Sequence, residues 1–234
     1  EPGDGTCPLN GNGNAVGDGR CEGMSFDDQC IINRPGENFV PDQKWSFKVN
    51  ASMPYASYDG PNFTGHAINQ VMMTPVVIDL QLRAGGVPNV VFTTFSTNQK
   101  TGTPGSPIHD DLITGVLRSV RGDTGEHDWS VGYKELSAFM GVSPQRPQLG
   151  FAPAGSIAAG DINGDGKPEI VAPLWDFNHA RKGLAAISNT GEVLWVTSEI
   201  DIPEESFGFA MWGGPSIDDL DGDGVPEIVF GSAI

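Results

Sequence analysis

The sequence predicts an all-β fold built from repeated units. The main observation is a stretch that occurs twice, because residues 149–171 and 207–229 superpose without a gap after a shift of 58 positions. A period of this length is typical of arrays of supersecondary units. The chain of 234 residues also contains 32 glycines and 18 prolines, which is typical of many short strands joined by turns.

Each copy of the repeat carries oxygen-bearing groups at alternating positions. The first set consists of Asp161, Asn163, Asp165, the carbonyl of Lys167 and Glu169, and the second consists of Asp219, Asp221, Asp223, the carbonyl of Val225 and Glu227. Calcium takes about six to eight oxygen ligands, often from side chains at loop positions 1, 3 and 5 and a carbonyl at position 7. The two sets therefore predict two calcium sites.

An EF-hand loop and a plain Asp-Gly turn are two other interpretations of these sets. An EF-hand loop ends in a glutamate at position 12, where this chain has Ala172 and Phe230. A plain Asp-Gly turn between strands needs no metal and would account for a single copy. Both copies keep every ligand position, which favours calcium over the plain turn.

The repeat resembles the FG-GAP, or VCBS-type, repeat of calcium-binding β-propellers, which also occurs in the heads of integrin α-subunits. Phe207-Gly208 and Gly213-Gly214-Pro215 match the pattern that gives the repeat its name, and Leu149-Gly150 with Ala154-Gly155 is a looser copy. The resemblance implies a β-propeller whose calcium ligands are the two sets above. The repeat serves adhesion proteins, lectin-like modules and some polysaccharide lyases, so it constrains the function only loosely.

The chain is expected to contain part of such a propeller. Residues 45–234 would form about two full four-stranded blades with parts of the flanking blades, and propellers close with about four to eight blades. Further residues or another chain would then complete the propeller. Residues 1–44 are rich in glycine and aspartate, lack periodicity and read as an irregular cap or linker that contains Cys7, Cys21 and Cys30.

Three predicted strands share a tryptophan: residues 44–49 with Trp45, 128–131 with Trp129 and 194–197 with Trp195. The last two follow predicted strands at 115–120 and 183–187, with Thr-Gly-Glu in the intervening turn. Each unit is therefore expected to end in a hairpin. A tryptophan that recurs at one place in a unit is typical of packing between units.

An earlier, degenerate copy spans residues 74–92. Gln81 and Asn89 replace acidic residues there, so no calcium is expected, and Arg83 is a candidate for a positive charge in place of the metal. Two insertions follow, at 96–111 and 131–148, and the second is expected to hold a short helix near 133–140. Insertions in repeat arrays usually lie on one face, often the binding face.

Composition limits the possible partners and compartments. The formal net charge of −17 and a pI near 4.3 argue against nucleic acid and against an anionic membrane. No run of 18 apolar residues is present, so no membrane insertion is expected. The cysteine cluster favours a secreted or cell-surface protein with one disulfide and one remaining thiol, although three free thiols in a reducing compartment stay an alternative.

The sequence favours a non-enzymatic binding, adhesion or assembly module with structural calcium, which recognises a protein or glycan through its loops. Two enzymatic alternatives remain. Residues 161–176 and 191–195 resemble a blade of rhamnogalacturonan-lyase propellers, although no catalytic residue can be assigned. The Thr-Gly-Glu-x-x-Trp hairpins resemble those of quinone-dependent dehydrogenases. Arg121-Gly122-Asp123 is a tripeptide that some integrins recognise, but a glycine-containing turn is the favoured interpretation.

Overall fold

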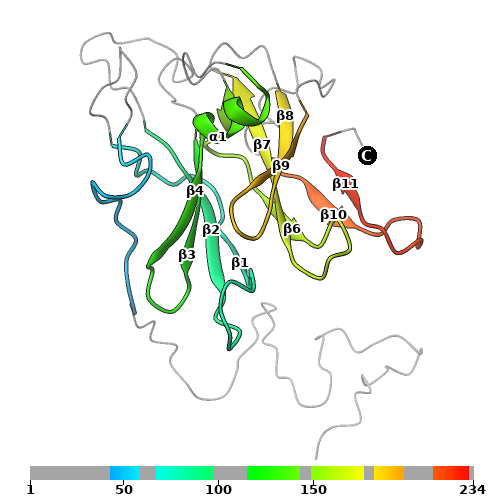
Figure 1. Cartoon of the computed structure of the whole chain (residues 1–234), viewed down its shortest axis with the longest axis horizontal. Helices are drawn as coiled ribbons and strands as arrows, with labels where there is room; N and C mark the ends of the chain where they lie inside the picture. The colour runs from blue at the N-terminus through cyan, green and yellow to red at the C-terminus, as the bar shows by residue number, and fades with distance from the viewer. Residues whose placement is uncertain are drawn as a thin grey trace, which may run out of the picture. The chain divides into compact units, whose positions relative to one another are not determined.

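The computed structural model describes residues 43–57, 67–96, 115–142, 149–176, 182–197 and 213–231. The chain divides into two units, Glu1–Gln43 and Lys44–Ile234. Residues 1–42, with the three cysteines, lie outside the described residues, so the cap or linker stays a prediction. The following description concerns the second unit (Figure 1).

Short antiparallel strands make up nearly all of the regular structure in the described residues, which confirms the all-β prediction. The strands are β1 (Val76–Ile78), β2 (Asn89–Thr94), β3 (Val116–Arg121), β4 (His127–Val131), β5 (Leu149–Phe151), β6 (Ala158–Gly160), β7 (Glu169–Asp176), β8 (Lys182–Ile187), β9 (Val193–Val196), β10 (Ser216–Asp218) and β11 (Glu227–Val229). The described residues also contain one helix, α1 (Tyr133–Phe139), which lies in the second predicted insertion.

A four-stranded sheet, a five-stranded sheet and one further hairpin follow one another along the described part of the chain. The first sheet has the order β1-β2-β3-β4. In the second sheet the long strand β7 pairs with β6 along its first half and with β5 along its second half, and β8 and β9 complete the order. The hairpin β10–β11 begins a third unit. This arrangement agrees with the prediction of about two full blades and part of another.

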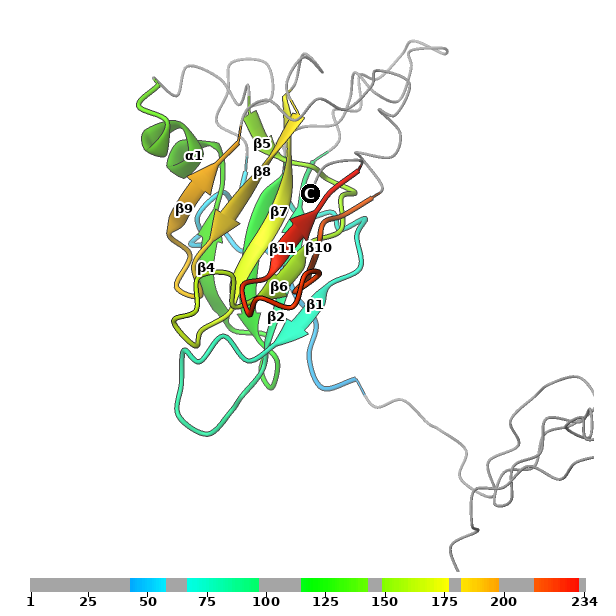
Figure 2. The ribbon, with the colours of Figure 1, turned by 90° about the vertical axis from the view of Figure 1, so that its right-hand side faces the viewer.

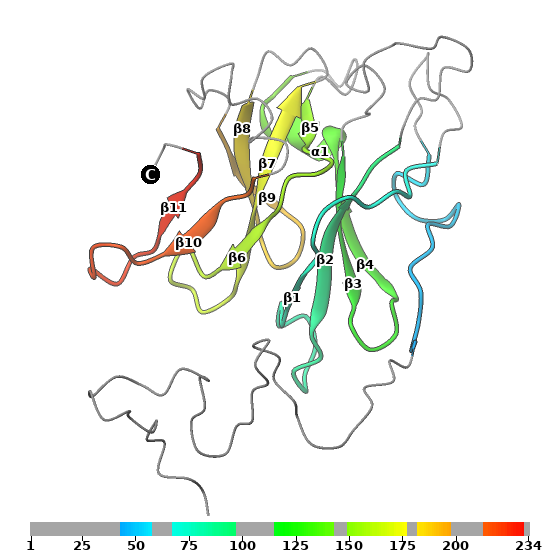
Figure 3. The same ribbon diagram turned by 180° about the vertical axis from the view of Figure 1, so that it is seen from behind.

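Strands β1, β6 and β10, one from each unit, follow one another side by side. Strand β6 contacts β1 of the preceding unit and β10 of the following unit, and Figure 3 shows β6 between them. In propeller-type folds, blades are arranged around an axis with their first strands innermost. The neighbouring positions of β1, β6 and β10 fit consecutive blades of such a fold.

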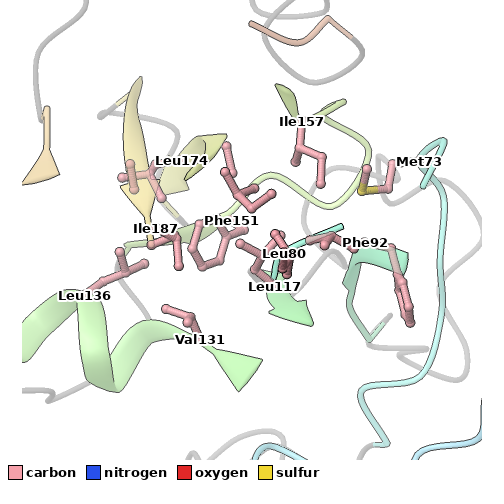
Figure 4. Packing of buried hydrophobic residues seen from close by; sticks show 14 of the residues in the cluster. Met73, Leu80, Phe92, Leu117, Val131, Leu136, Phe151, Ile157, Leu174 and Ile187 are labelled. Carbon is pink, nitrogen blue, oxygen red and sulfur yellow. The ribbon is translucent and has the colours of Figure 1, made fainter. Parts of the chain in front are cut away.

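Apolar side chains of the four-stranded and the five-stranded sheet meet in one core. Leu80 and Leu117 come from the first sheet and its connections, and Phe151 and Ile187 come from the second (Figure 4). Val91 of β2 belongs to the same core. All five are completely buried. Full burial of a large apolar side chain stabilises a fold by about 1.5–3 kcal/mol. The sheets therefore depend on each other for much of their stability.

Tryptophans join successive units through a repeated contact. The indole Nε1 of Trp45 donates to the carbonyl of Gly122 at 2.7 Å, and that of Trp129 donates to the carbonyl of Asn189 at 3.0 Å. Each ring also covers a glycine of the hairpin in the next unit. Trp195 packs in a cluster with residues of β10 and β11. The prediction that these tryptophans pack between units is confirmed.

A fully buried arginine fastens an irregular segment to the first sheet. Arg118 of β3 donates to the carbonyls of Pro54 and Tyr55 and to the hydroxyls of Thr94 and Ser130. Burial lowers the pKa of its guanidinium to about 10, which leaves the group charged at neutral pH. The hydrogen bonds compensate the guanidinium for the water that it loses in the core.

The helix and the hairpin connections lie at opposite ends of the sheets. Helix α1 contacts β4, β5 and β9, and its Leu136 is buried in the core. The connections β1–β2, β3–β4, β6–β7 and β8–β9 lie at the other end (Figures 1 and 2). The short helix confirms the prediction for residues 133–140.

One strand prediction is wrong. The structure has no strand at residues 44–49, although Trp45 occupies the expected contact with the next hairpin. A strand needs a neighbour to complete its ladder of backbone hydrogen bonds, and this segment pairs with no strand of the described residues. The apolar pattern thus identified the contact but not the backbone pairing.

The contact between tryptophan and glycine predicts how stability responds to an added methyl group. Gly191→Ala brings a Cβ to 2.9 Å from the Trp129 ring at a backbone φ of +90°. Gly141→Ala is a matched control, because φ is +68° and no atom lies within 4 Å of its Cβ. We expect the control to lose about 1–2 kcal/mol for its backbone conformation and Gly191→Ala to lose about 1–3 kcal/mol more. Equal losses in urea unfolding would contradict the contact between units.

Candidate metal centres

Both predicted ligand sets form connections of β-hairpins. Loop 1, residues 161–168, joins β6 to β7, and loop 2, residues 219–226, joins β10 to β11. Glu169 and Glu227 are the first residues of β7 and β11, opposite Gly160 and Asp218 respectively. Strand pairing therefore fixes both ends of each loop and brings the last predicted ligand next to the first.

The first aspartate of each loop accepts backbone hydrogen bonds from the loop that follows it. Asp161 Oδ1 accepts from the N–H groups of Gly164 at 2.7 Å and Asp165 at 3.2 Å, and its Oδ2 accepts from Gly166 at 2.8 Å. Asp219 makes the same three bonds, with Gly222 at 2.8 Å, Asp223 at 3.1 Å and Gly224 at 2.9 Å.

Three further bonds also recur in the two loops. In loop 1 they join Asp165 N to Asn163 Oδ1, Lys167 N to Asp165 Oδ1 and Ile162 N to Glu169 Oε2, at 2.9, 2.8 and 3.0 Å. In loop 2 they join Asp223 N to Asp221 Oδ1, Val225 N to Asp223 Oδ1 and Leu220 N to Glu227 Oε2, at 3.1, 2.8 and 2.7 Å. The two loops thus share one conformation as well as one sequence pattern.

Acidic side chains converge in loop 2. Carboxylate oxygens of Asp219, Asp221 and Glu227 lie within 4.8 Å of one another, whereas Asp223 is not part of this group. In loop 1 the position of Asp221 belongs to Asn163, whose side chain is within hydrogen-bonding reach of Glu169. In loop 2 the structure therefore brings together the first, second and last side chains of the predicted ligand set, and in loop 1 it brings the second side chain to the last.

The charges of loop 1 are only partly compensated. Backbone N–H groups, above all that of Gly166, lower the pKa of the Asp161 carboxyl. The Glu169 side chain is only 2% exposed, and burial, with Asp165 and Asp161 nearby, raises the pKa of its carboxyl. Among the described residues, arginines form their ion pairs elsewhere, with Asp128, Asp123 and Glu126.

This donor set fits a hard divalent cation. It consists of carboxylate and amide oxygens, and it contains no sulfur or imidazole. A buried carboxylate without a positive partner raises the free energy of the folded protein. A cation among these oxygens would lower it, so the chemistry of the residues and the electrostatics agree.

The degenerate copy has a different arrangement. Its connection, residues 79–88, is longer than loop 1, and Asn89 replaces the final glutamate. The Asn89 amide is buried and donates to Ser119 Oγ at 3.1 Å and Asp128 Oδ2 at 2.6 Å. Arg83 pairs with the same Asp128 of β4. The positive charge that the sequence suggested here therefore neutralises a carboxylate of the same sheet.

Sequence reasoning missed two bonds that join the degenerate connection to the next unit. Gln81 Nε2 donates to the carbonyl of Gly166 in loop 1 at 2.8 Å, and Asn189 Nδ2 donates to the carbonyl of Leu80 at 2.9 Å. The sequence pattern indicates only that Gln81 replaces an acidic residue of the ligand set. No local pattern signals these bonds, because their partners are 85 and 109 residues apart in the chain.

The Arg-Gly-Asp tripeptide lies in the β3–β4 hairpin. The Arg121 guanidinium donates to Asp123 Oδ1 at 3.0 Å and Oδ2 at 2.7 Å. Arg121 and Asp123 therefore form an ion pair with each other. The tripeptide lies at a hairpin turn, which is the interpretation that the sequence favoured.

A polar cavity of about 380 Å³ opens beside this hairpin. Its lining includes Lys48, Asn50, Thr124, Glu126 and His127. The His127 Nε2 forms a hydrogen bond with Ser130 Oγ at 2.7 Å, and burial lowers the pKa of the imidazole. Such a lining suits a small polar ligand better than an apolar one.

Residues 154–187 match the model of the FG-GAP repeat family. The match spans β6, loop 1, β7 and β8, and it confirms the repeat that the sequence suggested for this part of the chain. No curated protein matches the chain. No helix in the described residues is long and apolar enough to cross a membrane. FG-GAP repeats are typical of extracellular or cell-surface proteins, and the match fits a binding or adhesion module at this coarse level.

Proposed function

We propose that this chain is part of a calcium-stabilised, integrin-α-like β-propeller that works outside the cell as a binding or adhesion module. The observation that carries the proposal is the shared geometry of loops 1 and 2. Six equivalent hydrogen bonds form in each loop around oxygens of the predicted ligands. The proposed ligands are the side chains and carbonyls of the two sets predicted from the sequence.

Calcium has a structural role in this proposal. Each ion offsets the repulsion among carboxylates that the fold holds together and keeps the first two strands of a unit in register. Because the unfolded chain lacks this arrangement, the free energy of binding adds to the free energy of folding. At a free calcium concentration 100 times the Kd, one site contributes about 2.7 kcal/mol.

Recognition is assigned to the opposite end of the sheets. The two insertions follow β2 and β4, whose C-terminal ends point away from loops 1 and 2, because successive strands of an antiparallel meander alternate in direction. Residues 97–111 of the first insertion and 143–148 of the second lie outside the described residues. Phe139 at the end of α1 is 48% exposed and Val142 is 52% exposed. Apolar side chains exposed at this end of the sheets suit contact with a protein partner. The polar cavity near His127 lies at the other end, beside the β3–β4 hairpin, and is proposed as a separate site that suits a glycan.

The lyase alternative has less support. The residues that suggested it include Leu174 and Trp195, and both pack in apolar clusters. Core packing accounts for these two residues without chemistry on a sugar. Incubation with pectin fragments separates the proposals, because a lyase releases unsaturated products that absorb ultraviolet light, whereas a binding module releases none.

Calcium is expected to raise the thermal midpoint of unfolding. With one site contributing about 2.7 kcal/mol, a chain of this size gains roughly 5–10 °C per site relative to excess chelator. Asp165→Ala and Asp223→Ala should each remove about half of the total gain, and the double variant should remove all of it. A midpoint that is the same in calcium and in chelator would contradict both sites.

The charge of Glu169 predicts a reversal of stability between calcium and chelator. Burial and nearby aspartates raise its carboxyl pKa above the ordinary value of 4.5, so ionisation destabilises the fold as the pH rises above that value. In chelator at pH 7, Glu169→Gln should therefore be more stable than the natural chain. This advantage should disappear below pH 4.5, where the carboxyl is protonated in both folded and unfolded chains.

In calcium at pH 7 the order should reverse, because the amide is a weaker ligand than the carboxylate. Urea unfolding at several pH values, with calcium and with chelator, measures both effects. If Glu169→Gln were the less stable chain in chelator at pH 7, the carboxylate would already have a favourable partner within the protein.

A further inference from the structure

The degenerate unit reaches into loop 1 of the next unit through Gln81. The side-chain Nε2 of Gln81 donates to the carbonyl oxygen of Gly166 at 2.8 Å. Gln81 also has a backbone φ of +56°, a conformation that residues other than glycine adopt at a free-energy cost. An unfavourable conformation at a residue whose side chain crosses to another unit calls for a compensating role.

The backbone that carries the Gln81 side chain is held by several contacts. Leu80 is completely buried, and its carbonyl accepts from Asn189 Nδ2, whose residue is only 8% exposed. The Gln81 N–H donates to Asp79 Oδ1 at 2.8 Å. The side chain of Gln81 therefore extends from a backbone that the core, the β8–β9 hairpin and an aspartate fix together.

The Gln81 side chain donates to a peptide group inside loop 1. The Gly166 carbonyl and the Lys167 N–H belong to the same peptide group, and this N–H donates to Asp165 Oδ1 at 2.8 Å. Gly166 has a φ of +82° and no side chain to restrict it. Gln81 thus fixes the peptide plane on which the orientation of Asp165 depends, one residue before the proposed carbonyl ligand of Lys167.

Within the described residues, loop 2 receives no equivalent side-chain hydrogen bond from the preceding unit. The position of Gln81 in the unit that precedes loop 2 belongs to Asn163, whose side chain is used inside loop 1. None of the described residues donates a hydrogen bond to the carbonyl of Gly224, the counterpart of Gly166. The difference between the loops provides an internal comparison.

We propose that Gln81 is a positioning residue for cation binding at loop 1. The inference rests on the proposed calcium sites and adds a division of roles. The unit that lacks a calcium-ligand set of its own pre-organises the ligand set of the next unit. Pre-organisation of a binding loop increases affinity, because less conformational freedom is lost when the ion binds.

The test measures calcium affinity one loop at a time by titration calorimetry with CaCl2 on the full chain. In an Asp223→Ala background, which leaves loop 1 intact, Gln81→Ala should weaken calcium binding about 2- to 10-fold, the effect of one net hydrogen bond. In an Asp165→Ala background, Gln81→Ala should leave the affinity of loop 2 unchanged.

Gln81→Gly separates the hydrogen bond from the backbone conformation. Glycine adopts a φ of +56° readily, so this variant removes the side chain and the strain together. It should lose as much loop 1 affinity as Gln81→Ala while being at least as stable as that variant in chelator. Unchanged loop 1 affinity in Gln81→Ala, or an equal loss at both loops, would overturn the inference alone. An unsubstituted chain that binds no calcium would overturn the proposed function as well.

Discussion

The carboxylate of the first aspartate organises each cation loop around itself. Asp161 accepts three short-range backbone N–H groups and Asp219 accepts the equivalent three, so the chain must curl with glycines at the positions of positive φ. The curl brings the side chains of Asn163 and Asp221 close to Glu169 and Glu227, which begin the strands that follow. Strand pairing then places a glutamate at the mouth of the loop. The resulting concentration of negative charge is the feature that the proposed calcium relieves.

Contacts between units transmit this local order. Trp45 and Trp129 each cover a glycine of the next hairpin, and Asn189 holds the backbone beside Gln81. The core is likewise shared, since side chains of the four-stranded sheet, the five-stranded sheet and α1 pack together. A change in one loop is therefore expected to affect the neighbouring unit, as in other repeat proteins, whose stability includes interface terms.

Much of this arrangement could be predicted from the sequence. The spacing from Asp161 to Glu169 is nearly self-contained, because its hydrogen bonds join residues at most seven positions apart. The tryptophan contacts were also predictable, since an apolar ring that recurs once per unit needs a recurring neighbour. The strand expected at residues 44–49 was not, because its apolar pattern says nothing about a pairing partner. Arg118 and Gln81 escaped prediction because their partners lie far away in the sequence.

The central claim is that loops 1 and 2 each hold one calcium ion, and native mass spectrometry of the full chain tests it most directly. The spectra should show that Asp161→Ala and Asp219→Ala each reduce the number of calcium ions per chain by one and that the double variant reduces it by two. A calcium count that stays the same in the double variant would contradict the account, because the conserved geometry of the two loops would then be that of hairpin turns alone.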